Sequence, residues 1–360
     1  MLNKQIHSCS FMPTTLSLSS LIKLALTFVF TGILLVANAQ NTVSGSMPLD
    51  LAIDARSAAL GGKVVADLKP DGHASSYNPI SVDSSAVGII HTSYLNYYAA
   101  IQIGAIDAVI KTGKKHTIHV GSRFASFGKF SGYDVSGLPT GDFSGGDYVL
   151  QSGIKWELDS VWSIGITGWG GFRNLALENA GILGIDAAVI GRWPDRNFAA
   201  GVLLSGFGRQ FAGTGSQPVG AMPINFQIGF TKGFENAPFQ LYLKAQNLEH
   251  WELAPEGIYE DGIDPLTGEI IQNTTWEFGD QFMRHISAGV EINLGSGLAA
   301  QIGYDHRRRI EMASMGRKGT NGFSMGVHLR IRETDIGLAR NTYHFAGSST
   351  HLSIAIALPD

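Results

Sequence analysis

Alternation of apolar and polar residues constrains this chain more than any other feature of its sequence. From Ile224 to Thr231 every second residue is Ile or Phe, and the residues between them are Asn, Gln, Gly and Thr. The same alternation runs through 238–246, 285–294 and 323–332. A period of two residues is that of a β-strand with one apolar face. A soluble β-sandwich shows the same pattern, so alternation alone leaves a sandwich and a membrane barrel both open.

The number and spacing of these segments favour the barrel. Fourteen segments are predicted as strands, near 87–97, 100–110, 117–127, 147–158, 161–172, 182–193, 198–207, 222–231, 238–248, 284–294, 298–307, 322–331, 335–345 and 350–358. The connectors after even-numbered segments are short, whereas the long ones, 128–146, 208–221, 249–283 and 308–321, all follow odd-numbered segments. Long loops at one rim and short turns at the other are typical of outer-membrane barrels, and they predict that both termini are periplasmic.

Composition excludes the other ways of crossing a membrane. After residue 40 no stretch approaches 18 consecutive apolar residues, which is too little for a spanning helix. In lipid every backbone polar group must be satisfied internally, so only a closed barrel remains. The 45 glycines and the 16% of charged residues suit strands and tight turns. The formal net charge of −4 argues against a nucleic-acid partner.

The first 39 residues are predicted to be a secretory signal peptide, 1–39. Lys4 and Lys23 precede an apolar run at 24–36, and Ala37-Asn38-Ala39 is a small-residue cleavage site. A membrane anchor is the weaker alternative, because a spanning helix needs about 20 apolar residues. The one cysteine, Cys9, lies inside this segment, so we expect no disulfide and no cysteine metal ligand in the exported chain.

Between the signal peptide and the first strand lies a segment of another kind, at 40–86. Asp54 and Arg56 open a short helical turn that Gly61 and Gly62 end, and Asn78-Pro79 marks a turn. We expect this segment to fold into the lumen as a plug, or hatch, of an all-β barrel formed by 87–360.

Eight short strings in the same order then carry a family resemblance over nearly the whole exported chain. They are Asp54–Gly62, Tyr77–Pro79, Ser93–Tyr97, Gly128–Tyr133, Thr140–Phe143, Met283–His285, Gly303–Arg307 and Tyr343–Gly347. The chain resembles the PorQ family, outer-membrane barrels of the type IX secretion system of Bacteroidetes that are related to PorV and, more distantly, to the FadL transporters. The resemblance implies a fourteen-stranded FadL-like barrel with an N-terminal hatch. It also implies a non-catalytic scaffold that holds a PorZ-like surface protein, with PorU and PorV in the same complex, for attachment of secreted proteins to lipopolysaccharide.

The loop at 249–283 is the main candidate for partner docking. It holds nine carboxylates and no Lys or Arg, with aromatic residues between them. A docking surface, in which aromatics act as anchors, and a solvated mobile loop both fit this composition. The docking candidates are Trp251, Tyr259, Glu260, Asp261, Asp264 and Trp276. EF-hand spacing is absent, so no metal site is expected there.

Arg307, Arg308 and Arg309 are candidates for contact with lipopolysaccharide phosphates at the outer rim. Solubility at the membrane boundary is the alternative. Charged residues on the polar faces of the strands, among them His119, are expected to fill the lumen and pair with one another or with the hatch.

Two further functions compete with the scaffold. A FadL-like transporter of hydrophobic small molecules would need an apolar pocket, and the polar inward positions weaken that interpretation. An outer-membrane hydrolase would need a nucleophile with a positioned histidine, and no G-x-S-x-G string is present. We therefore expect no enzyme activity and no cofactor.

Overall fold

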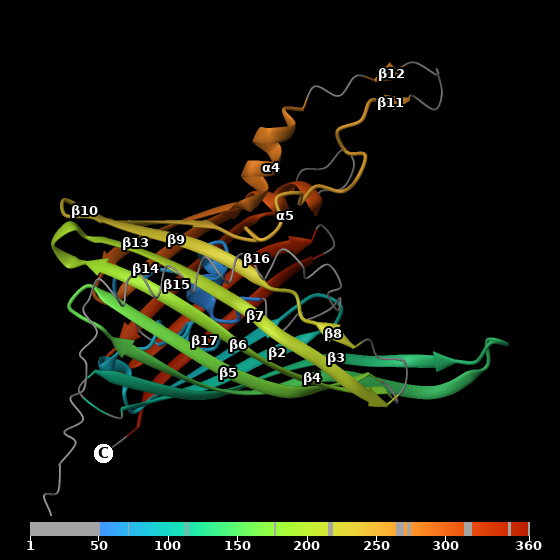
Figure 1. Cartoon of the computed structure of the whole chain (residues 1–360), viewed down its shortest axis with the longest axis horizontal. Coiled ribbons are helices and arrows are strands. Elements are labelled where there is room, and N and C mark those ends of the chain that lie inside the picture. The colour runs from blue at the N-terminus through green and yellow to red at the C-terminus, as the bar shows by residue number, and fades with distance from the viewer. Residues whose placement is uncertain are drawn as a thin grey trace, which may run out of the picture. The chain divides into compact units, whose positions relative to one another are not determined.

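Strands that alternate inward and outward side chains close into a barrel in the computed structural model of this chain (Figure 1). The structure describes residues 51–70, 72–111, 113, 115–175, 178–214, 219–263, 270–271, 275–312, 319–344 and 347–358. The predicted signal peptide and the start of the predicted hatch lie outside these residues.

Among the described residues, fourteen strands form one antiparallel sheet that closes on itself. They are β1 (Ile89–Asn96), β2 (Gln102–Lys111), β3 (His116–Tyr133), β4 (Pro139–Glu157), β5 (Trp162–Leu175), β6 (Glu178–Trp193), β7 (Phe198–Thr214), β9 (Asn225–Phe234), β10 (Ala237–Ala245), β13 (Ile286–Gly295), β14 (Leu298–Asp305), β15 (Phe323–Ile331), β16 (Thr334–His344) and β17 (Gly347–Ala357). Each strand pairs with its neighbour in the chain, and β1 pairs with β17. The two-residue β8 (Gly220–Ala221) pairs antiparallel with β7, and β11 (Gly262–Ile263) pairs with β12 (Ile270–Ile271).

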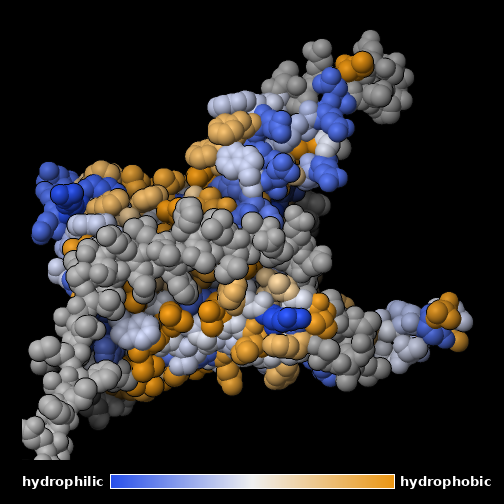
Figure 2. Space-filling model, viewed as in Figure 1, coloured by the Kyte–Doolittle hydropathy of each residue, from blue (hydrophilic) through white to orange (hydrophobic). Residues whose placement is uncertain are grey.

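The two faces of the strands differ as lipid and lumen require. In β1, His91, Ser93 and Leu95 are buried whereas Tyr94 is exposed. Outward positions of other strands carry exposed apolar side chains, including Ile106, Val120, Leu150, Ile166, Leu183, Leu243, Ile302, Met325, Leu338 and Leu352. Figure 2 shows apolar side chains gathered over the strands. Soluble proteins rarely expose an apolar surface of this extent to water, whereas a barrel in lipid needs an apolar outer face and keeps its charges in the lumen. The chain is therefore an outer-membrane β-barrel.

No helix among the described residues is long and apolar enough to cross a membrane. The helices are instead short and form no part of the barrel wall: α3 (Ala55–Ala59), α4 (Glu277–His285), α5 (His306–Glu311), and the 3-10 turns η1 (Ser84–Ala86) and η2 (Pro194–Arg196).

The connections between strands confirm the predicted asymmetry, with corrections to two predicted loops. Residues 208–214 were expected to begin a loop, but they belong to β7 and pair with β6. Residues 128–146 were expected to be a loop. They instead continue the β3–β4 ladder, with Phe130 opposite Phe143, to a turn at 134–138. The two rings stack with centroids 5.3 Å apart, and backbone pairing satisfies the polar groups that a loop would expose. This hairpin, and α4 with the short strands β11 and β12, project beyond the rest of the barrel (Figure 1).

Aromatic residues near the short turns pack against one another. Trp162 contacts Trp193, which stacks on Phe198 with ring centroids 5.6 Å apart. Such rings suit a membrane–water interface, where the aromatic residues of outer-membrane barrels gather.

Candidate functional site

The N-terminal segment, residues 51–88, lies against inward-facing side chains of many strands. Asp54 caps α3 by accepting a hydrogen bond from the backbone N–H of Ser57, 2.8 Å away. Gly61 follows the helix with φ of +90°, and a Cβ there would lie 3.2 Å from the carbonyl oxygen of Tyr304. Gly303 is equally necessary, because a Cβ there would lie 2.2 Å from the amide nitrogen of Gly61. Glycines on both sides therefore let α3 approach the barrel wall at backbone distance.

Polar contacts attach this segment to the wall on several sides. Arg56 donates to Glu291 of β13 at 2.7 Å, to Asp67 at 2.5 Å and to the hydroxyl of Tyr242 at 2.7 Å. The side-chain amide of Asn341 on β16 donates to the Ala58 carbonyl at 3.0 Å. These bonds are charge-assisted or buried, so each fixes a donor and an acceptor that would be costly to leave unpaired.

The remaining hatch residues predicted from the sequence have local structural roles. The Asn78 amide donates to the carbonyls of Val64 and Val65 at 3.0 and 3.1 Å, which closes a loop within the segment. Pro79 lies against β5, since a Cβ at Gly165 would be 2.9 Å from it. Gly62 has φ of +129°, a conformation that only glycine adopts without strain.

Two cavities with no lining residue in common lie within the barrel. One, of about 230 Å³, is lined by polar groups that include Lys63, Lys244, Asp305 and Glu311. The other, of about 1200 Å³, opens among the short turns and is lined by Arg56, Asp67, Glu291 and many others. Buried charges such as Arg123 and Lys155 line the same lumen, as predicted for the polar strand faces.

The second candidate site lies at the opposite rim and is named here the α4 platform: α4 with its N-cap residue Trp276, α5 and Trp251. The sequence did not predict either helix. The sequence did carry one signal for α4, a charge pattern that suits the helix dipole. Its first turn holds Glu277 and Asp280, and its last turn holds Arg284 and His285. A helix of nine residues is too short for its hydrophobic period to stand out from loop sequence.

Ion pairs hold the two helices of the platform together. The buried Arg284 donates to Asp280 at 2.7 Å and to Glu311 of α5 at 3.2 Å. Glu311 also accepts from Arg307 at 2.9 Å. The Tyr259 hydroxyl donates to Asp280 at 2.7 Å.

These contacts set the ionisation of the platform. Burial alone would raise the pKa of Asp280, but the hydrogen bonds from Tyr259 and Arg284 hold it below its ordinary value of 3.8. Burial and the same hydrogen bond to Asp280 raise the pKa of Tyr259.

Four aromatic side chains of the platform remain exposed. Trp276 is 73% exposed, Phe278 57%, and Trp251 and Phe282 48% each. Phe278 lies between the two tryptophans, with ring centroids 5.4 Å from Trp251 and 5.9 Å from Trp276. Figure 2 shows the mixture of apolar and charged side chains that results. The sequence predicted the two tryptophans as docking candidates. It did not predict the two phenylalanines, which lie four residues apart on α4.

The other docking candidates are distributed less closely. Tyr259 contacts α4 through Asp280, and Glu260 and Asp261 are exposed beyond it. Asp264 lies outside the described residues.

The arginines proposed for lipopolysaccharide contact lie in α5 rather than in a loop. Arg309 donates to the Gly319 carbonyl at 2.6 Å and lies over the Phe323 ring. Arg308 lies 3.9 Å from Asp305, and Arg307 pairs with Glu311. Each guanidinium thus has a partner within the chain, and phosphate contact stays a prediction.

Comparison with known proteins identifies no family: no family model and no curated protein matches the chain. Among solved structures, the toluene transporter TodX of Pseudomonas putida has a TM-score of 0.48 at 13% identity, covering 84% of this chain and 96% of its own. The monoaromatic hydrocarbon channel CymD has a TM-score of 0.49 at 11% identity, covering 86% and 98%. A FadL homologue of Pseudomonas aeruginosa has 0.38 at 10%, covering 75% and 89%. These are channels rather than enzymes.

Proposed function

We propose that this chain is a non-catalytic outer-membrane scaffold that holds a soluble surface protein on its long-loop rim. The PorQ-like motifs imply the partner: a PorZ-like protein, in a complex with PorU and PorV that attaches secreted proteins to lipopolysaccharide. The observation that carries the proposal is the exposed aromatic surface of the α4 platform.

The chemistry of that surface supports protein docking. Aromatic side chains anchor protein interfaces, where a buried hot-spot residue typically contributes about 2 kcal/mol or more. The four rings are exposed to water in the chain alone, and a bound partner that covered them would gain the free energy of burying apolar surface. The ion pairs of Arg284 and Asp280 order the helix beneath them, which lowers the entropy that binding must remove.

The contacts of the N-terminal segment with the inner face of the wall support the same proposal. The N-terminal segment contacts strands from β4 round to β17, and the lumen side chains beside it are largely polar. A function at the rim needs no passage through this interior.

Replacement of 251–276 by a short Gly-Ser turn tests the proposal. Insertion should be unaffected, because loop-closure free energy changes slowly with length and no strand of the barrel is removed. A PorZ-like protein should then move from the cell surface into the medium, measured by blotting of both fractions. The matched control replaces 134–138, the tip of the β3–β4 hairpin, and should retain the partner.

A single cysteine introduced as Ser144→Cys, at an exposed position of the same hairpin outside both replaced ranges, is labelled on whole cells with an impermeant maleimide and confirms that each variant is inserted with this rim outside. If the 251–276 variant is labelled normally and keeps its partner, the scaffold proposal in this form fails, and Arg307 to Arg309 become the next surface to test.

A second candidate is transport of hydrophobic small molecules, the function named for the matched hydrocarbon channels. The two separate cavities on either side of the N-terminal segment favour it, since movement of that segment would join them. Uptake of toluene by cells with and without the chain tests it. If the chain is a transporter, cells without it should lose toluene uptake, and cells with the 251–276 replacement should keep it. If the chain is only a scaffold, toluene uptake should be the same in all three strains.

A further inference from the structure

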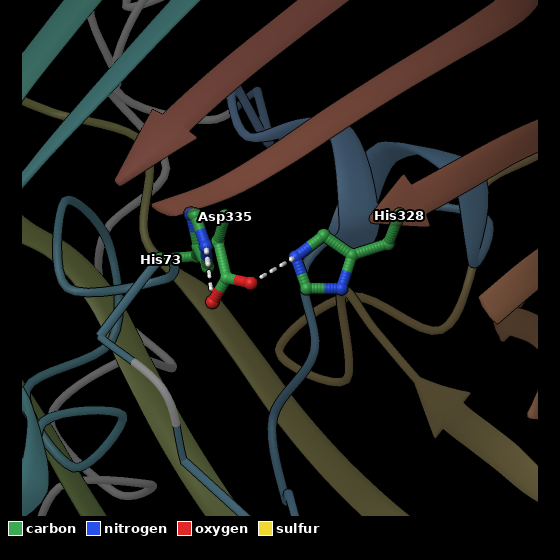
Figure 3. Close-up of side chains that lie close together, drawn as sticks. All are labelled: His73, His328 and Asp335. Carbon is green, nitrogen blue, oxygen red and sulfur yellow. Dashed lines mark ion pairs between the residues drawn. The ribbon is translucent and has the colours of Figure 1, made fainter. Parts of the chain in front are cut away.

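A cluster of metal-ligating side chains lies where the N-terminal segment meets the barrel wall. His73 comes from the N-terminal segment, His328 from β15 and Asp335 from β16 (Figure 3). One nitrogen or oxygen of each lies within 4.8 Å of those of the other two. Asp335 is the centre of the group: its Oδ2 is 4.0 Å from Nε2 of His73, and its Oδ1 is 3.7 Å from Nε2 of His328.

The three side chains are buried or nearly so, which separates this cluster from an ordinary group of surface charges. The side chain of His73 is 3% exposed, and those of His328 and Asp335 are 12% and 11% exposed. His91 of β1 packs edge-on against His73, with ring centroids 4.8 Å apart, and limits the orientation of that ring. The ring of His328 meets His73 at 89° and 5.6 Å.

From this arrangement we propose that His73, His328 and Asp335 bind a divalent transition metal ion of the Zn²⁺ class. Two imidazole nitrogens and one carboxylate oxygen suit such ions, whereas Mg²⁺ and Ca²⁺ prefer oxygen ligands alone. In a tetrahedral zinc site, bond lengths of about 2.0–2.2 Å place ligand atoms roughly 3.3 Å apart. The observed distances therefore require a contraction of between a few tenths of an ångström and about 1.5 Å, within the reach of side-chain rotation.

Arg330 is the neighbour that competes most directly for Asp335. It donates to Oδ1 at 2.8 Å and to Oδ2 at 2.6 Å. Oδ2 also accepts from Nε of Arg330 at 3.0 Å. A carboxylate accepts about four hydrogen bonds, two at each oxygen, so Oδ1 keeps a lone pair for the metal. The guanidinium is 56% exposed, which screens its repulsion of a cation, and its two bonds hold the carboxylate in place.

The position of the cluster gives the ion a route and a structural effect. His91, His328 and Asp335 line the cavity of about 1200 Å³ that opens among the short turns. A bound ion would link the N-terminal segment to β15 and β16, at a distance from the α4 platform. The site is therefore independent of the proposed scaffold function. Its ligands come from separate elements of the fold, which is why no metal-ligand spacing appears in the sequence.

The test uses the full chain, purified in detergent without a polyhistidine tag and stripped with a chelator. Zn²⁺ is titrated by isothermal calorimetry, and Co²⁺ by visible absorption, because tetrahedral Co²⁺ absorbs far more strongly than the hydrated ion. The native chain should bind one equivalent of Zn²⁺ and give the tetrahedral Co²⁺ spectrum. His73→Gln and His328→Gln should each weaken Zn²⁺ binding roughly tenfold or more.

The matched control is His119→Gln, which changes a buried lumen histidine of β3 whose Nε2 lies 3.0 Å from the hydroxyl of Thr167. Its Zn²⁺ affinity should equal that of the native chain. Heat-modifiable gel mobility selects folded protein, and Asp335→Asn, which keeps the side-chain shape, replaces any histidine variant that fails to fold. Native binding no tighter than that of the folded ligand variants, or an octahedral Co²⁺ spectrum, would overturn the proposal.

Discussion

At the scale of single residues, Arg56 shows how the N-terminal segment is held. Its guanidinium donates to the carboxylate of Asp67 within the segment, and to the carboxylate of Glu291 and the hydroxyl of Tyr242 on the barrel wall. The sequence singled out Arg56 as part of a motif, and the pairing with the hatch was predicted for lumen charges in general. The identity of Glu291 as its partner was not predictable, since 235 residues separate the two.

The first prediction concerns this ion pair. Arg56→Ala leaves Glu291 and Asp67 buried without their cation, a change that typically costs about 3 to 5 kcal/mol. Because the barrel strands bond to one another and not through Arg56, the loss should appear in the N-terminal segment. Hydrogen exchange at 51–80 should accelerate, with little change in the strands. Arg196→Ala, at an exposed position of η2, is the control, and an equal effect of both variants would contradict the assigned role.

A second prediction at this scale concerns Asp280. Its pKa in the folded chain lies below the ordinary 3.8, so its ion pair stabilises the α4 platform at neutral pH. That stabilisation is lost as the pH falls through the lowered pKa, below 3.8. Asp280→Asn should reproduce the acid state at pH 7, with faster hydrogen exchange in α4. Unchanged exchange in the variant would show that other contacts order the helix.

At the scale of elements, the strands were predictable and the rim structures were not. Strands such as β9 and β15 were evident because lipid on one side and a polar lumen on the other impose a strict period of two. The β3–β4 extension beyond residue 127 projects past the rest of the barrel (Figure 1), and its residues no longer alternate between buried and exposed although the backbone pairing continues. The helices α4 and α5 are short, and their order comes from the Arg284–Glu311 contact between them rather than from local sequence.

The candidate sites divide in the same way. Trp251 and Trp276 were found because aromatic residues are conspicuous in an acidic loop, but their common neighbour Phe278 emerges only once α4 is formed. The His73–His328–Asp335 cluster depends on barrel closure and on the path of the N-terminal segment. Neither is encoded in local spacing.

At the scale of the whole molecule, closure of the barrel wall and occupation of its lumen depend on different contacts. Closure rests on the continuous ladder from β1 to β17 and satisfies the backbone within lipid. Occupation rests on residues 51–88, which contact the wall through side chains and packing, apart from the backbone hydrogen bonds that join Gly88 to Val109 and Leu358. A barrel without this segment should therefore still close, and the segment should determine whether solute passes.

Single-channel recording in planar bilayers tests that account most directly. The native chain should give no steady conductance, because the N-terminal segment lies between the two cavities of its lumen. A variant lacking 44–80, shown by heat-modifiable mobility to be folded, should open a steady pore while keeping its surface partner. A native chain that conducts as well as the deletion variant would contradict a barrel that is closed within and acts at its rim.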